Sequence, residues 1–288
     1  GDRREGSLRQ RRIDLRCASS TELDLPPASL DAVVTDPPYF ANVQYAELMD
    51  FCYVWLRKLV SDPAFASHST RNKNELTGNA TMDRGLEHFT EGMAGVFARM
   101  RTALKPGHPL VFTYHHNSIE AYFPIAAALL DAGLVCSATL PCPAEMGASI
   151  HINGTGSSIV DTAFVCRSTG TVARRLITTT PQEIAGLVRD DVEMLKGADF
   201  EPTHGDIRCV AYGHLIRMAV WELRRVWRAD AATGEKLERV AGFVSALGGW
   251  PAVERWLREN LRKAPTAQSW VAKDAPAGYG GDADAVSF

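Results

Sequence analysis

Residues 30–39 read LDAVVTDPPY, and this stretch decides the fold. The run 30–35 is short, apolar and rich in β-branched residues, which is typical of a strand buried on both faces. The tetrapeptide Asp36-Pro37-Pro38-Tyr39 then ends the strand, because proline fixes the backbone and cannot donate to a ladder. We therefore expect a central strand that presents these four residues at the edge where open α/β sheets bind ligands.

The segments that follow alternate between strand and helix patterns. In chain order the patterns predict strands at 13–18, 30–35, 109–114, 134–140 and 159–166, and helices at 44–59, 86–104 and 119–132. This alternation indicates an α/β fold with a doubly wound, mostly parallel sheet. No helix separates the last two strands, so we expect them to form an antiparallel pair at the edge of the sheet.

Composition and charge narrow the class of protein. With 288 residues, 45% of them hydrophobic and 23% charged, the chain resembles an ordinary soluble domain with an appendage. No apolar run approaches the roughly 20 residues of a membrane span, and no signal peptide precedes the first predicted strand. The six cysteines form no CxxC pair, so we expect reduced thiols, no metal site and a cytoplasmic protein.

The tetrapeptide carries the groups needed to hold a planar base by its amino group. Asp36 offers a carboxylate, a proline carbonyl can accept the second amine proton, and Tyr39 offers an aromatic face. Holding both protons leaves the nitrogen lone pair free to attack a sulfonium methyl group. We predict as catalytic residues Asp36, Pro37, Pro38 and Tyr39, and as base contacts Tyr39, Phe40 and Asn42. The alternative is that the tetrapeptide is only a turn that ends the strand.

Two adjacent histidines, His115 and His116, follow the strand predicted at 109–114. Adjacent residues on a strand point to opposite faces, so these two side chains would not bind one ion together. Direct methyl transfer also needs no metal, and we therefore assign both histidines to positioning or structure.

Three segments together resemble a known family. They are TDPPYFANVQYAELMDFCYVWLRK at 35–58, LKPGHPLVFTYHH at 104–116 and EMGASIHINGTGSSIVDTAFVCR at 145–167. They resemble the bacterial and archaeal adenine-specific DNA methylases that have an N-terminal domain of unknown function and often a zinc ribbon. The resemblance covers residues 13–167 and implies a Rossmann-like methyltransferase that acts on N6 of adenine in DNA. It also implies S-adenosyl-L-methionine as the methyl donor.

One feature of such methylases is missing from the sequence. They hold the donor through a strand ending in a motif like Asp-Pro-Phe-x-Gly-x-Gly, followed by an acidic residue for the ribose. The nearest candidate, Gly154-Thr155-Gly156, lies in a loop that enters a strand, which is the wrong context. The remaining candidate donor contacts are Ser19 and Ser20, in the turn after the first predicted strand, and Asp36. We therefore expect a catalytic half that an N-terminal donor-binding segment or a partner subunit completes.

Other functions stay open at this point. Asp at the first position of the tetrapeptide is more typical of adenine N6 enzymes, whereas cytosine N4 enzymes more often have Ser there. The substrate could instead be cytosine N4 or an amine in RNA, or the chain could be a non-catalytic nucleic-acid-binding subunit without a donor site. The loops 61–85 and 141–158 are the candidates for contacts to the target.

The patterns divide the chain into four parts. A basic arm over 1–12 has five arginines and is either a solvated terminus or a phosphate-contacting segment. The catalytic part covers 13–170, and a helical region follows over 171–272. The small, Gly-rich tail over 273–288 is expected to be disordered.

Overall fold

The computed structural model describes residues 13–41, 43–72, 74–79, 82–144, 158–260 and 285–288. The basic arm, Asn42, the Gly154-Thr155-Gly156 loop and most of the tail therefore lie outside the described residues. None of the helices in these ranges has the length and apolar content needed to cross a bilayer.

A four-stranded mixed sheet forms the centre of the molecule, and its order is β1-β2-β4-β3. The strands are β1 (Val33–Thr35), β2 (Leu110–Tyr114), β3 (Val135–Pro143) and β4 (Val160–Arg167). β1 and β2 are parallel, whereas β2 with β4 and β3 with β4 are antiparallel. The α/β class and the antiparallel pair at one edge are confirmed. The expected mostly parallel sheet is wrong, because β1 with β2 is the single parallel pair among the described strands.

The sequence predicted that β1 is central, but β1 lies at the edge of this sheet. Its residue Val34 is 79% exposed, so the expected burial on both faces is wrong as well. The strand predicted at 13–18 is also wrong: this segment has no strand partner, and Ile13 and Leu15 are 79% and 89% exposed. A β-branched or alternating run signals strand propensity, but pairing depends on neighbours that propensity does not specify.

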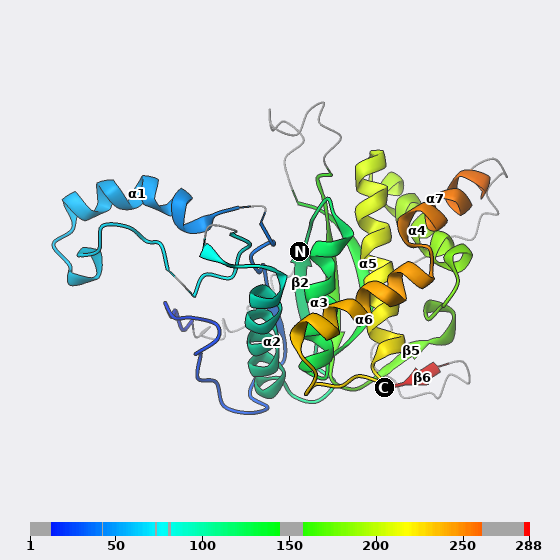
Figure 1. Cartoon of the computed structure of the whole chain (residues 1–288), viewed down its shortest axis with the longest axis horizontal. Coiled ribbons are helices and arrows are strands. Elements are labelled where there is room, and N and C mark those ends of the chain that lie inside the picture. The colour runs from blue at the N-terminus through cyan, green and yellow to red at the C-terminus, as the bar shows by residue number, and fades with distance from the viewer. Residues whose placement is uncertain (1–12, 42, 73, 80–81, 145–157, 261–284) are drawn as a thin grey trace, which may run out of the picture.

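Three helices lie side by side on one face of the sheet (Figure 1): α2 (Leu86–Ala103), α3 (Phe123–Asp131) and α5 (His204–Leu223). On that face the ring of Phe112 stacks on Phe164 at 5.1 Å and contacts Phe97 of α2 at 5.0 Å. Two residues before Phe164, Thr162 presses against Gly213 of α5, where a Cβ would come within 2.6 Å of the Thr162 side chain.

The opposite face of the sheet is less well covered. Val111, Thr113 and Val165 alternate with the buried residues of β2 and β4, and they are only half-buried. The expected doubly wound arrangement, with helices on both faces, therefore stays a prediction.

The remaining helices are α1 (Tyr45–Leu59), α4 (Pro181–Gly197), α6 (Thr233–Ala246) and α7 (Gly249–Asn260). Helix α1 extends away from the body of the molecule (Figure 1). Helices α4 to α7 lie within the predicted helical region, which begins instead with a short strand, β5 (Thr171–Ala173). β5 pairs antiparallel with β6 (Ala285–Ser287), so the expectation of disorder is wrong for the last residues of the tail.

Candidate functional site

The DPPY tetrapeptide, Asp36 to Tyr39, follows β1 directly. Asp36 is exposed, Pro37 is buried, and Pro38 and Tyr39 are half-buried. Thr35 pairs with Phe112, and parallel strands end at the same edge of a sheet. The end of β2 therefore lies beside the tetrapeptide.

Asp36 is held through one of its two carboxylate oxygens. The hydroxyl of Thr113 donates a hydrogen bond to Asp36 Oδ1, and Tyr39 Oη lies 3.1 Å from the same oxygen. Within the described residues no hydrogen bond reaches Asp36 Oδ2. This oxygen belongs to an exposed side chain whose direction is fixed, so it can accept a hydrogen bond from a ligand.

Tyr39 has a second and closer carboxylate neighbour, Asp161 of β4. Tyr39 Oη lies 2.6 Å from Asp161 Oδ2, against 3.1 Å from Asp36 Oδ1. A tyrosine has one hydroxyl proton, and we place it on the shorter contact, where the hydroxyl donates to Asp161. Burial, followed by this hydrogen bond, raises the pKa of Tyr39 far above its ordinary value. The side chain therefore stays neutral and its ring is fixed at the edge of the site.

Neighbouring rings further restrict Tyr39. Its ring meets Tyr114 edge to face, with centroids 5.4 Å apart, and lies 6.5 Å from the ring of His115. The ring of Phe40 packs edge to face against the buried ring of Phe89, with centroids 5.5 Å apart. The backbone N–H of Phe40 donates a hydrogen bond to Tyr114 Oη at 3.4 Å. The structure thus places Phe40 against the core, and its predicted contact with a base stays a prediction.

Asp206, at the start of α5, fixes the beginning of β4 and with it the position of Asp161. Its Oδ1 accepts hydrogen bonds from the Ser158 hydroxyl and the Ile159 N–H at 2.7 and 2.9 Å. Its Oδ2 accepts from the N–H of Thr203 at 2.7 Å, which completes the capping box of α5. Burial acts to raise the pKa of Asp206, but the hydrogen bonds from Thr203 and Ser158 outweigh it and the pKa is lowered.

The predicted loop 61–85 packs back on the segment that follows the tetrapeptide. Gln44 Nε2 donates to the carbonyl of Gly78 at 2.7 Å, and the Thr77 hydroxyl donates to the carbonyl of Val43 at 3.0 Å. Gly78 is required for this approach, because a Cβ there would lie 2.8 Å from the ring of Phe40. The loop therefore holds the segment that follows the tetrapeptide in place. Its predicted role in target recognition stays a prediction.

The two histidines follow the end of β2 and have different surroundings. His115 Nδ1 lies 3.3 Å from the Val160 carbonyl and 3.9 Å from Asp161 Oδ1. His116 Nδ1 accepts a hydrogen bond from the Ser118 N–H at 2.9 Å, and burial lowers the pKa of His116. His116 thus serves a local turn, whereas His115 borders the Tyr39–Asp161 pair.

The predicted donor contacts Ser19 and Ser20 do not join this cluster. They lie in an exposed turn where the hydroxyl oxygens of Ser19 and Thr21 are 2.7 Å apart. In the part of the chain that is described, neither serine forms a hydrogen bond with the tetrapeptide.

Sequence reasoning missed Thr113 and Asp161. Asp161 lies 122 residues from Tyr39 along the chain. The available signal was a lone carboxylate inside the apolar run IVDTAFV, because a buried charge requires a partner.

Comparisons with protein-family models, with curated proteins and with solved structures found no match to this chain. Among the described residues, no group of three or more His, Cys, Asp or Glu side chains is arranged to hold a metal ion. The function must therefore be argued from the geometry of the site.

Proposed function

We propose that this chain carries the base-binding half of an S-adenosylmethionine-dependent methyltransferase that modifies N6 of adenine in DNA. The observation that carries the proposal is the hydrogen bonding of the Asp36 carboxylate. One carboxylate oxygen accepts a hydrogen bond from the Thr113 hydroxyl, and the other belongs to an exposed side chain and accepts no hydrogen bond within the described residues. Such a carboxylate fits an exocyclic amine, which offers N–H donors in the plane of the base.

The tetrapeptide would hold the base by three groups. Asp36 Oδ2 accepts one amine proton, and a carbonyl of Pro37 or Pro38 accepts the other. The Tyr39 ring, anchored by Asp161, offers its face for stacking, which contributes about 1–3 kcal/mol per base. With both amine protons held, the nitrogen lone pair is directed outward, and a bound donor would supply the methyl group that it attacks.

The described residues do not fit the donor itself. Ser19 and Ser20 lie in an exposed turn, and no glycine-rich turn follows a described parallel strand. We therefore assign the donor site to a segment or subunit beyond the described residues. The open edge of β1 supports this assignment, because an exposed strand edge is a template for further pairing and Val34 is exposed there. A Rossmann-like sheet completed along this edge would place β1 at its centre.

The lack of a donor site among the described residues also favours a second candidate. In it, the chain is a nucleic-acid-binding subunit that captures an unstacked base without transferring a methyl group. Both candidates require Asp36 to recognise an amine, and they differ in whether a donor site is joined to it.

Recognition of the amine can be tested with the chain alone. Saturation-transfer NMR would compare adenosine with purine riboside, which lacks the exocyclic amine. We expect a signal for adenosine that is weak or absent for purine riboside, and that Asp36→Ala removes this preference. Asp31→Ala is the matched control, because Asp31 pairs with Lys105 at the surface at 2.5 Å before β1 begins. Equal signals from both nucleosides in the unmodified chain would contradict the proposal.

A further inference from the structure

A concave site lies between α5, β6 and the segment after β5. It is a cavity of about 430 Å³, within the range of small-molecule sites. β5 follows the end of β4, which pairs with the start of β2, whereas the tetrapeptide lies beside the end of β2. The cavity therefore lies near one end of the strands of the sheet, and Asp36 lies at the other end.

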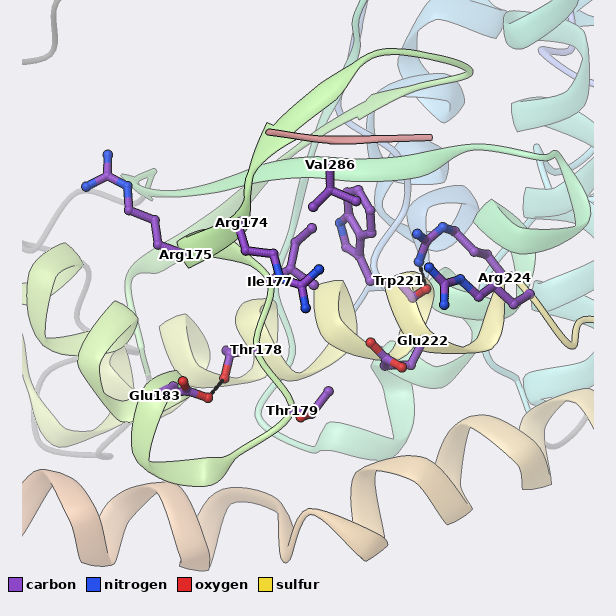
Figure 2. A pocket seen from close by; sticks show the side chains of 11 residues that line it. Arg174, Arg175, Ile177, Thr178, Thr179, Glu183, Trp221, Glu222, Arg224 and Val286 are labelled. Carbon is purple, nitrogen blue, oxygen red and sulfur yellow. Dashed lines mark hydrogen bonds between the residues drawn. The ribbon is translucent and has the colours of Figure 1, made fainter. Parts of the chain in front are cut away.

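The wall of this cavity is rich in arginine. Arg174 and Arg175 come from a 3₁₀ turn after β5, and Arg224 and Arg225 follow the last residue of α5. Figure 2 shows Arg174 and Arg224 pointing toward one another from opposite sides, whereas Arg175 points away. Two guanidinium groups from separate elements thus face a shared space.

The wall of the cavity holds two carboxylates, Glu183 and Glu222, against four arginines. Glu183 is already engaged, because the hydroxyls of Thr178 and Thr180 donate to it at the start of α4. Glu222 also lines the cavity and its charge acts on Arg224, but no ion pair of Arg174, Arg224 or Arg225 with a carboxylate is found within the described ranges. An excess of positive charge therefore remains in the cavity.

Arg224 is held in place before any ligand arrives. Its guanidinium carbon lies 4.2 Å from the centroid of the Trp221 ring, and its Nη1 donates to the Trp221 carbonyl. The buried Trp221 is itself fixed by a hydrogen bond from its Nε1 to the Cys136 carbonyl at 2.8 Å. Burial and the neighbouring charge of Arg225 lower the pKa of Arg224, and the charge of Glu222 opposes them without outweighing them.

We propose that this cavity binds a small phosphorylated ligand whose phosphoryl oxygens are held between Arg174 and Arg224. The planar guanidinium fork matches phosphate oxygens in pairs, and the Thr178 and Thr179 residues of the same wall add polar lining. A small ligand is favoured over a nucleic-acid backbone because Arg174 and Arg224 face one another across a cavity. Stabilisation of the α5 C-terminus accounts for Arg224 and Arg225 but not for Arg174, which comes from another element.

Calorimetric titration with inorganic pyrophosphate at constant ionic strength tests this proposal. We expect saturable binding that Arg174→Ala weakens roughly tenfold or more, because charge-assisted hydrogen bonds are lost. Arg175→Ala is the matched control: it removes the same charge from the adjacent residue, and should weaken binding no more than a few-fold. Circular dichroism of both variants verifies that the exposed substitutions leave the fold unchanged.

Three results would overturn the proposal. The first is an absence of saturable binding of pyrophosphate. The second is an equal loss in Arg174→Ala and Arg175→Ala, which would show only unspecific attraction. The third is an Arg174-dependent affinity for duplex DNA without any for pyrophosphate, which would assign the cavity to a nucleic-acid backbone.

Discussion

The hydrogen bond between Tyr39 and Asp161 gives a quantitative prediction. The two oxygens are 2.6 Å apart, and the Asp161 side chain is only 9% exposed. Hydrogen bonds to charged groups contribute about 1.5–3 kcal/mol, and little solvent is present here to weaken this one. We therefore expect a coupling energy of about 1.5–3 kcal/mol in a double-mutant cycle of Tyr39→Phe and Asp161→Ala.

Urea unfolding of the unmodified chain, the two single variants and the double variant measures this coupling. A parallel cycle of Tyr53→Phe with Asp161→Ala is the control, because the Tyr53 hydroxyl donates instead to the Ser67 carbonyl at 3.0 Å. This control should show additive effects. A Tyr39–Asp161 coupling below about 0.5 kcal/mol, the usual scatter for independent sites, would refute the placement of the Tyr39 proton.

Three further predictions concern the loop, the support of β4 and the donor. Gly78→Ala should lower the free energy of unfolding by about 1–3 kcal/mol through overpacking against Phe40. Gly85→Ala is the control and should change this free energy far less, because a Cβ there meets nothing within 4 Å. Urea unfolding of both variants measures the difference. The pKa of Asp206 is lowered in the folded chain, so its contribution to stability is complete above the unfolded value of about 3.9 and is lost as the pH falls through the folded value. Unfolding measured against pH should thus be flatter in acid for Asp206→Asn, and an unchanged pH dependence would contradict this. The chain alone should bind S-adenosylmethionine weakly or not at all in a calorimetric titration, and a dissociation constant of a few micromolar or tighter would show that the donor site has been misplaced.

Local patterns predicted most elements but not their arrangement. The spacing of apolar residues located α1 and α2 closely, because a helix depends on contacts within a few residues. The predicted central position of β1 was wrong, because an apolar run does not determine which strands pair with it. Three helices gather on one face, and this depends on long-range contacts such as that of Thr162 with Gly213.

The candidate site shows the same limit. Sequence reasoning found Asp36 and Tyr39 because they are adjacent in a distinctive tetrapeptide. It missed Asp161, which reaches Tyr39 only after β4 has paired antiparallel with β2. The arginine cavity was likewise out of reach, since Arg174 and Arg224 meet only in the folded chain.

Methyl transfer by a protein that joins this chain to its donor-binding segment tests the central claim most directly. Duplex DNA would be incubated with tritiated S-adenosylmethionine, digested to nucleosides and analysed by mass spectrometry. We expect N6-methyladenine from the unmodified protein and from Asp31→Ala, and almost none from Asp36→Ala. Equal methylation by Asp36→Ala, or a product other than a methylated amino group, would contradict the assignment of Asp36 as the residue that holds the amine.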